Sequence, residues 1–357
     1  MLHSKPPAII ILSVLLMLSV TLASAQDLGP FSELRNVSAN INVELTTDGR
    51  CKLEITGSAF TEPSEIPTDV PISKADIGLK LSSPSPSVLR ANISASIDFT
   101  ELPSEVAGLS KESINALIVL SGIVGKSLGE LLSQSELEIP YAEYPPEVYE
   151  ITITKLECTR FSVSGKKMGA DFVAEFSGSI PENVREGLPL EMKIQLEISE
   201  SLIEINVSVS GEDGNVNVTF KGRPSTGKLE FSLSAIFDLP IEADKVSWSF
   251  ALPPEYAIIL ETLENVLSSA DISLKLKVPE GASVESLPSG YTTSDGNTFE
   301  WSGSAAQNAL LSMLGGQSQA SISYVPSKPK PNVIMIGVAA AIIVVVLAAV
   351  AIILKKR

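Results

Sequence analysis

The chain contains one histidine, His3, two cysteines and only 5% aromatic residues, and its 26 lysines and arginines are outnumbered by 42 aspartates and glutamates. This scarcity of cations, with no basic stripe, argues against nucleic-acid binding, because phosphate recognition depends on clustered Lys and Arg. His3 falls in a segment that we expect to be cleaved, so the mature protein would contain no imidazole. Chemistry that needs a histidine base or ligand is therefore excluded.

The remaining composition is that of a folded protein. Apolar residues make up 44% of the 357 positions, which is enough to fill a core and excludes disorder throughout. A chain of this length is expected to form about two domains.

The first 25 residues predict a secretory signal peptide. Lys5 precedes an apolar run from Ala8 to Leu22, and Ala23-Ser24-Ala25 provides small residues at a cleavage site. An uncleaved anchor is the alternative, but a helix of this run is too short for a hydrocarbon layer of about 30 Å. We expect cleavage after Ala25.

Residues 333–354 predict a transmembrane helix. No charge interrupts the run from Val333 to Leu354, which as a helix is about 33 Å long. Three basic residues follow it directly: Lys355, Lys356 and Arg357. The positive-inside rule places this tail in the cytoplasm and the body outside the cell. A GPI attachment signal is the alternative, but such tails normally end in apolar residues.

The body between leader and anchor is strongly acidic. Without Lys5 and the three C-terminal cations, it keeps 22 cations against 42 anions, a formal charge of −20. Such a charge favours solubility and repels similar surfaces. Calcium binding is an alternative, but no Asp-x-Asp-x-Asp-Gly loop is present. We predict no metal site and no cofactor.

Alternation of apolar and polar residues predicts that most of the body is strand. A hairpin is expected over residues 41–55, with Asp48-Gly49 in its turn, and a second strand pair over residues 77–99. A longer meander is expected over residues 172–235. Short polar links favour antiparallel neighbours, because a parallel crossover needs a dozen or more residues.

Three segments change to helical periodicity. They cover residues 110–134, with Ser110 as N-cap, residues 254–269, which Pro254 begins, and residues 305–314. The expected fold class is therefore α+β and β-rich, with antiparallel meander sheets, two or three amphipathic helices packed on one face and one C-terminal transmembrane helix.

The expected organisation has seven parts. They are a signal peptide (1–25), an N-terminal β-hairpin and helix region (26–145), a long meander with a helix (146–270), a membrane-proximal β-rich module (271–325), a Pro/Lys stalk (326–332), the transmembrane helix (333–354) and the cytoplasmic tail (355–357). The boundary near residue 145 rests on Pro145-Pro146, and the stalk on its alternating prolines.

Cys51 and Cys158 both fall in predicted strands. In an extracellular compartment an even count favours one disulfide between them, which would close a loop of about 100 residues and stabilise the fold by about 4–5 kcal/mol. The alternative is two buried, unpaired thiols that behave as small apolar residues.

Four Asn-x-Ser/Thr sequons are present, at Asn36, Asn92, Asn206 and Asn217. Each asparagine has the parity opposite to the apolar residues of its strand, so all four should face solvent, where a glycan can be attached. The simpler alternative is that polar residues occupy the solvent face in any case.

No catalytic residue is predicted. Gly122 to Ser127 resembles a phosphate-binding loop but lacks its first glycine, because position 120 is leucine. The acidic run Glu138, Glu143, Glu147 and Glu150 could supply a carboxylate pair for glycoside hydrolysis but reads more simply as a solvated linker. Trp248 and Trp301 could be exposed sugar platforms, and the alternative is that they belong to the core.

These patterns predict a single-pass cell-surface glycoprotein, not an enzyme, that displays an acidic β-rich body as a structural or adhesion component of the cell envelope. Its partners would be membrane lipid, through residues 333–354, and an extracellular protein or glycan, with no nucleic acid. The alternative function is a membrane-anchored binding module for a hydrophobic ligand such as a lipid, held between sheet and helices. An extracellular hydrolase is the third hypothesis.

Overall fold

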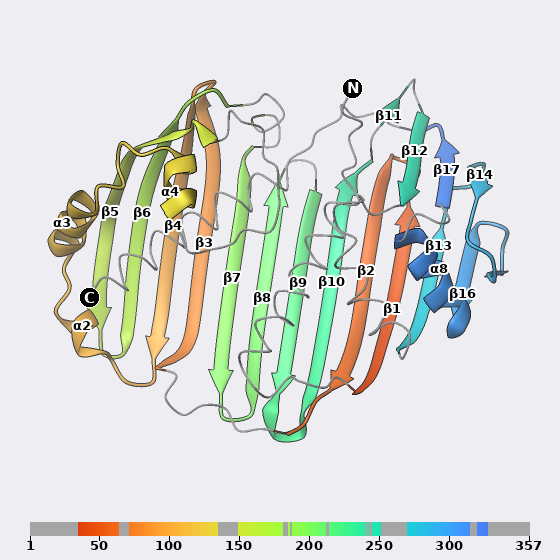
Figure 1. The fold of residues 1–357 in the computed structure, drawn as a ribbon, viewed down its shortest axis with the longest axis horizontal. Coiled ribbons are helices and arrows are strands. Elements are labelled where there is room, and N and C mark those ends of the chain that lie inside the picture. Colours follow the sequence, from red (N-terminus) through yellow and green to blue (C-terminus); the bar gives the residue numbers. More distant parts are fainter. Residues whose placement is uncertain are drawn as a thin grey trace. The chain divides into compact units, whose positions relative to one another are not determined.

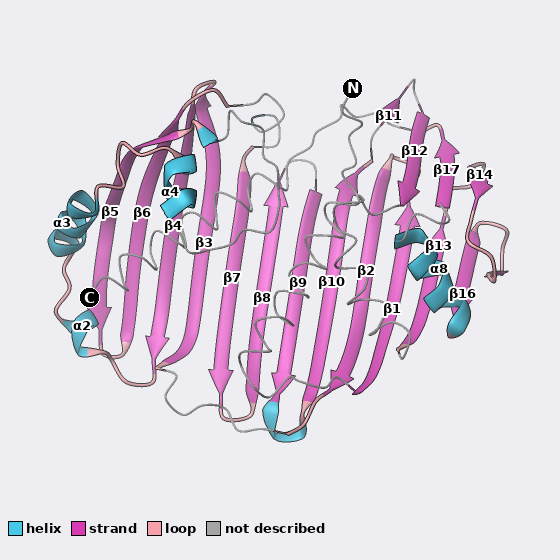
Figure 2. Ribbon diagram, in the orientation of Figure 1, coloured by secondary structure: helices cyan, strands magenta, loops and turns pink. Residues whose placement is uncertain are grey.

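The structure is a computed structural model that describes residues 35–63, 71–134, 149–180, 185, 188–211, 214–239, 241–242, 245–250, 270–314 and 320–327. The chain is β-rich and mostly antiparallel with few helices (Figures 1 and 2), as the alternating pattern predicts. Its described residues form two compact units. Unit 1 contains residues 35–63, 200–205 and 214–327, and unit 2 contains residues 71–134, 149–199 and 206–211, so that β8 (Leu202–Gly211) contributes to both.

The larger sheet of unit 1 has the strand order β15-β16-β13-β1-β2-β10-β9. Its strands are β1 (Arg35–Leu45), β2 (Arg50–Phe60), β9 (Gly214–Arg223), β10 (Lys228–Asp238), β13 (Asp271–Lys277), β15 (Thr292–Thr293) and β16 (Thr298–Ser302). The expected hairpin is confirmed as β1 and β2, and Gly49, with a φ of 83°, makes the positive-φ position of its turn. A 3-10 turn, η1 (Pro224–Thr226), links β9 to β10.

One pairing in unit 1 departs from the antiparallel expectation. β13 lies parallel to β1, with Ile41 opposite Leu274 and Val43 opposite Leu276. The rule that short links make antiparallel neighbours concerns strands that follow one another, and β1 and β13 are more than 200 residues apart in the chain. Their alternating patterns agree in parity, so their apolar side chains share one face.

A second, four-stranded sheet in unit 1 has the order β11-β12-β17-β14. Its strands are β11 (Ile241–Glu242), β12 (Lys245–Phe250), β14 (Ser283–Ser286) and β17 (Ala320–Tyr324). The third predicted helix is confirmed as α8 (Ser304–Leu314), which contacts β13 and β16 and buries Ala306, Ala309 and Met313.

Unit 2 holds the strand order β7-β3-β4-β6-β5. Its strands are β3 (Ile72–Ser85), β4 (Val88–Phe99), β5 (Thr152–Ser164), β6 (Lys167–Ser177) and β7 (Leu190–Ser199). Neighbouring strands in this order are antiparallel, which confirms the expected strand pair over residues 77–99. The start of the expected meander is wrong, because β3 and β4 lie between β6 and β7; the link over residues 178–189 is long enough to pass them. The inward residues form a core that includes Leu79, Leu89, Ala174, Phe176 and Met192.

The predicted helix over residues 110–134 is two helices. α3 (Lys111–Ser121) begins at the predicted cap Ser110, whose side chain accepts a hydrogen bond from the Ser113 N–H, and ends at Gly122 in the left-handed conformation. α4 (Leu128–Gln134) follows, and a short helix, α2 (Ser104–Ala107), precedes them. A glycine with positive φ ends a helix whether or not the apolar stripe continues beyond it, which explains the break.

Edge strand β5 is covered along its outer side. Asn115 of α3 donates from its amide to the Cys158 carbonyl (3.0 Å) and accepts from the Cys158 N–H (2.8 Å), as a neighbouring strand would. Farther along, the Gly125 N–H donates to the Ile153 carbonyl at 2.8 Å. Such cover blocks edge-to-edge pairing with another molecule.

The predicted signal peptide, the boundary near residue 145, the helix over residues 254–269, the end of the stalk and the transmembrane helix lie outside the described residues. Within the part of the chain that is described, no helix has the length and apolar character needed to cross a membrane.

Candidate functional site

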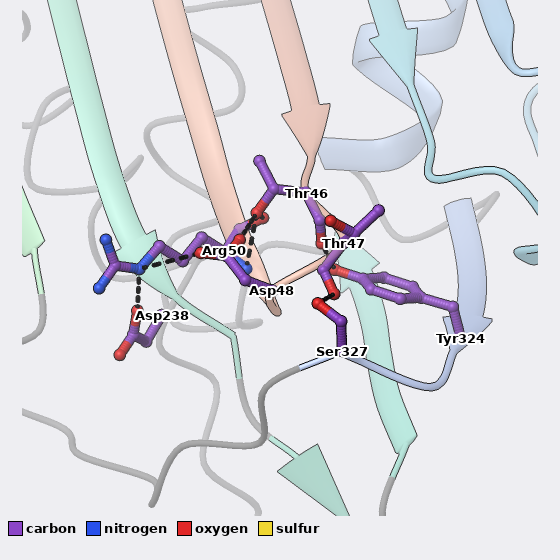
Figure 3. A network of polar contacts seen from close by, with 7 residues as sticks. All are labelled: Thr46, Thr47, Asp48, Arg50, Asp238, Tyr324 and Ser327. Atoms are coloured by element: carbon purple, nitrogen blue, oxygen red, sulfur yellow. Dashed lines mark hydrogen bonds and ion pairs between the residues drawn. The ribbon is translucent and has the colours of Figure 1, made fainter.

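The turn between β1 and β2 is the place where three distant parts of unit 1 meet (Figure 3). Thr46, Thr47, Asp48 and Gly49 form the turn, which is closed by hydrogen bonds from the Thr46 N–H to the Arg50 carbonyl (2.8 Å) and from the Gly49 N–H to the Thr46 carbonyl (3.1 Å). The Thr46 hydroxyl donates to the Asp48 carboxylate within the turn. The turn is therefore held by hydrogen bonds of its own, in addition to those from other segments.

The end of β10 lies against one side of this turn. Arg50 and Asp238 are directly opposite in the β2–β10 register, and the Arg50 Nε donates to the Asp238 carboxylate at 2.8 Å. Their side chains are 32% and 12% exposed, so this ion pair is better shielded than a surface pair. The Leu239 N–H then donates to the Gly49 carbonyl at 2.8 Å.

The chain that leaves β17 lies against the other side. The Tyr324 hydroxyl donates to the Thr46 carbonyl at 2.8 Å, and Ser327 donates to the Thr47 carbonyl from its N–H (2.7 Å) and from its hydroxyl (3.0 Å). Burial raises the pKa of Tyr324, so its hydroxyl keeps the proton that it donates. We call Thr46, Thr47, Tyr324 and Ser327 the exit clamp, because it holds the chain where it enters the predicted stalk.

Replacing Tyr324 by phenylalanine tests the exit clamp. Phenylalanine keeps the buried ring and removes only the hydroxyl, so we expect the free energy of unfolding to fall by about 1 kcal/mol, the net value of one hydrogen bond. Urea unfolding of the two proteins measures it. Tyr291→Phe is the control, because Tyr291 is 42% exposed and its ring contacts with Phe299 and Trp301 would persist. Equal stability of the two variants would contradict a contribution from the clamp.

The sequon asparagines that lie on the strands differ in exposure. Asn36, Asn92 and Asn217 are exposed, as their parity predicts, whereas Asn206 on β8 is half-buried. Asn36 also has a φ of 51°, in the left-handed region that asparagine tolerates better than most residues. Exposure makes a glycan possible at three of these positions; attachment stays a prediction.

The structure holds Cys51 and Cys158 as free thiols, where the sequence predicts a disulfide between them. Cys51 is 2% exposed in the core of unit 1, and Cys158 is fully buried in unit 2. Burial raises the pKa of the Cys51 thiol to about 12 and also raises that of Cys158. Each cysteine takes an inward-facing position of its strand, as an apolar residue does. An even count carries no information about which strands are neighbours.

Other residues singled out in the sequence serve the fold. Trp301 is 2% exposed, and its indole N–H donates to the carbonyls of Pro288 and Ser289 at 3.2 Å, which confirms the core alternative. The segment from Gly122 to Ser127 borders β5, and the Gly125 and Lys126 N–H groups donate to the carbonyls of Ile153 and Ile123, so these two are not free to bind a phosphate. Glu150 is exposed. Glu138, Glu143 and Glu147 lie outside the described residues, as does the side chain of Trp248.

Sequence reasoning missed the exit clamp and Asn115. Both depend on contacts between residues far apart in the chain, 278 positions in the case of Tyr324 and Thr46. No local pattern marks a tyrosine at the end of a strand as the donor to a distant turn. Among the described residues, no group of three or more Asp, Glu, Cys or His side chains is arranged to hold a metal ion.

No protein-family model matches the chain, and a search of curated proteins finds no significant match.

Proposed function

We propose that this chain is a single-pass cell-surface protein that displays an acidic, glycosylated β-rich body outside the cell, as a structural or adhesion component of the envelope. The observation that carries the proposal is the exit clamp. It fastens the last described residues, next to the predicted stalk and anchor, to a hydrogen-bonded turn of the body. In a displayed body, force transmitted through the anchor would reach the fold first at this exit, and the clamp would resist the detachment of β17 from its sheet.

The solvent faces of the larger sheet of unit 1 and of the unit 2 sheet support the same role. Cross-strand ion pairs cover them, including Lys80–Glu191 (2.6 Å) and Arg90–Glu175 (2.7 Å) in unit 2 and Lys275–Glu300 (2.8 Å) in unit 1. Each pair adds little stability in water, but a face of alternating charges stays hydrated and resists non-specific association. The work of the protein would then be done by surface contacts.

One exposed apolar surface is available for such contacts. At the end of α3, Val119 and Leu120 are 78% and 81% exposed, and Val124 is 42% exposed. Exposed clusters of large apolar residues are typical of interaction sites. The competing proposal, a hydrophobic ligand between sheet and helices, has no comparable support, since the described core of unit 2 is packed with side chains from β3, β4, β6 and β7 and from residues 123–128.

Protease treatment of intact cells tests the proposed topology. We expect the body to be digested on intact cells, and a truncation after residue 332 to release the protein into the medium. A cytoplasmic marker protein should remain intact and shows that the cells have not lysed. Full protection of the chain on intact cells, with digestion only after lysis, would show that the proposed orientation is wrong.

A further inference from the structure

The solvent face of unit 2 carries an open hollow with a volume of about 320 Å³. It lies over the middle strands, and most of its lining residues belong to the polar face. The register places Gly78 of β3 opposite Ser94 of β4, and Lys80 opposite Asn92. Because Gly78 has no side chain and Ser94 has a small one, the face is lower here than around it.

Polar and charged groups surround this hollow. The Lys80–Glu191 ion pair (2.6 Å) lies on one side and Asp171, paired with Arg160 at 2.7 Å, on the other. Lys193 and Thr159 also line it, and both are exposed. Val173, half-buried and directly opposite Asn92 on β6, adds an apolar contact. Donors, acceptors and one apolar side chain together are what a sugar ring binds.

The hollow contains a complete glycosylation sequon. Asn92 and Ser94, the first and third residues of Asn92-Ile93-Ser94, both line it and are both exposed. A sugar on the Asn92 amide nitrogen would start inside the hollow, because Asn92 is one of its walls. The volume is near the lower end of the range for small-molecule sites, about 300–1,000 Å³, so only the sugar units nearest the asparagine could fit.

We propose that Asn92 carries an N-linked glycan whose first sugar units lie in this hollow, against Val173 and the Lys80–Glu191 pair. This inference rests on the proposed glycosylated surface and names the site that holds its sugar. In the attachment step, the Asn92 amide nitrogen forms a bond to the anomeric carbon of a sugar on a lipid-phosphate carrier. The bond from that carbon to the phosphate oxygen breaks, the phosphate carries away its electron pair, and the proton that the amide loses passes to the released phosphate or to water.

A seated glycan is protected from enzymes that remove it. The test uses the full chain, expressed with a secretory leader in cultured eukaryotic cells that attach N-acetylglucosamine-based glycans. Mass spectrometry of the peptides gives the occupancy of Asn92 and Asn217. A peptide-N-glycosidase time course on the native protein should then release the Asn92 glycan on the order of tenfold more slowly than the Asn217 glycan. After denaturation the two rates should be equal.

Filling the hollow should abolish this protection. Gly78→Val puts a side chain in its centre, and the only close contact of the new Cβ is the Ser94 hydroxyl, at 2.6 Å, which can rotate away. Gly169→Val is the matched control, since Gly169 lies on the same face of the sheet, on β6, outside the hollow, and its new Cβ would be 3.2 Å from the Ser162 hydroxyl. In Gly78→Val we expect the Asn92 glycan to be released as fast as the Asn217 glycan. In Gly169→Val we expect the Asn92 glycan to be released as slowly as in the chain without a substitution.

The outcomes separate the two proposals. The glycan on Asn92 could be released as fast as the one on Asn217 in the native protein, or it could stay protected in Gly78→Val. Either result overturns the proposal that the glycan lies in the hollow, which we call the seat, and leaves the proposal of a glycosylated surface intact. Unmodified asparagines at all four sequons overturn the glycosylated surface and the seat together. Modification at Asn217 with an unmodified Asn92 overturns the seat alone.

Discussion

Replacing Phe176 by alanine is expected to lower the free energy of unfolding by about 3–5 kcal/mol, the usual cost of removing a large buried aromatic side chain. Phe176 is 1% exposed on β6. It lies directly opposite Leu89 of β4 on one side and Ile153 of β5 on the other, and all three belong to the core of unit 2. Alanine would leave a cavity that these strands cannot close, because backbone hydrogen bonds hold them in register.

Val173→Ala is the matched control for Phe176→Ala. It lies on the same strand with the opposite parity, half-buried on the solvent face, so we expect a loss below about 1 kcal/mol. The free energy of unfolding of both variants is measured by urea titration, monitored by far-UV circular dichroism. If the two variants lose equal stability, the assignment of the buried face of unit 2 is wrong.

Gly57→Ala is expected to destabilise unit 1 by about 1–3 kcal/mol, although alanine is the smallest possible addition. A Cβ at Gly57 would lie 2.2 Å from Cε1 of the Phe231 ring and 2.7 Å from the Ser38 carbonyl oxygen. Phe231 is directly opposite Gly57 in the β2–β10 register, and its ring lies over the glycine. The ring would have to move, and the carbonyl oxygen of a paired strand moves only if the sheet distorts.

Gly222→Ala tests whether this cost comes from the close contact. Gly222 lies on β9 in the same unit, and a Cβ there would meet its nearest neighbour, Leu229 Cδ2, at an ordinary 3.5 Å. We expect this variant to unfold within about 0.5 kcal/mol of the original chain or to be slightly more stable, since alanine restricts the unfolded state. A loss at Gly222 as large as that at Gly57 would attribute the effect to glycine replacement in general.

Strand patterns and turn residues predicted the local structure well. The alternation over residues 41–55 and 77–99 is a property of neighbouring positions, and it appears as β1–β2 and β3–β4. Ser110 could be predicted as a helix cap because capping also depends only on neighbouring positions in the sequence. The prediction was wrong where a local signal was outweighed, as at Gly122, where a left-handed glycine divides one expected helix into two.

The exit clamp could not be predicted from local sequence patterns. Tyr324 and Ser327 look like ordinary strand-end residues, and only the folded chain brings them to the turn at Thr46 and Thr47. The hollow around Asn92 similarly needs Gly78 and Ser94 to be opposite each other, which is decided by the register of β3 against β4. The parity of Asn92 in its strand predicted that it faces solvent, and the register of β3 against β4 places it in the lining of the hollow.

The sequence alone determined which side of each strand is apolar, where most strands turn, and that the chain is acidic with a single histidine. Tertiary structure decided which strands are neighbours: the parallel β1–β13 pair, the separate burial of Cys51 and Cys158, and the exit clamp. The physical reason is that alternation fixes the direction of a side chain relative to its own strand. Pairing depends on the total burial and hydrogen bonding of the whole sheet, to which residues hundreds of positions apart contribute equally.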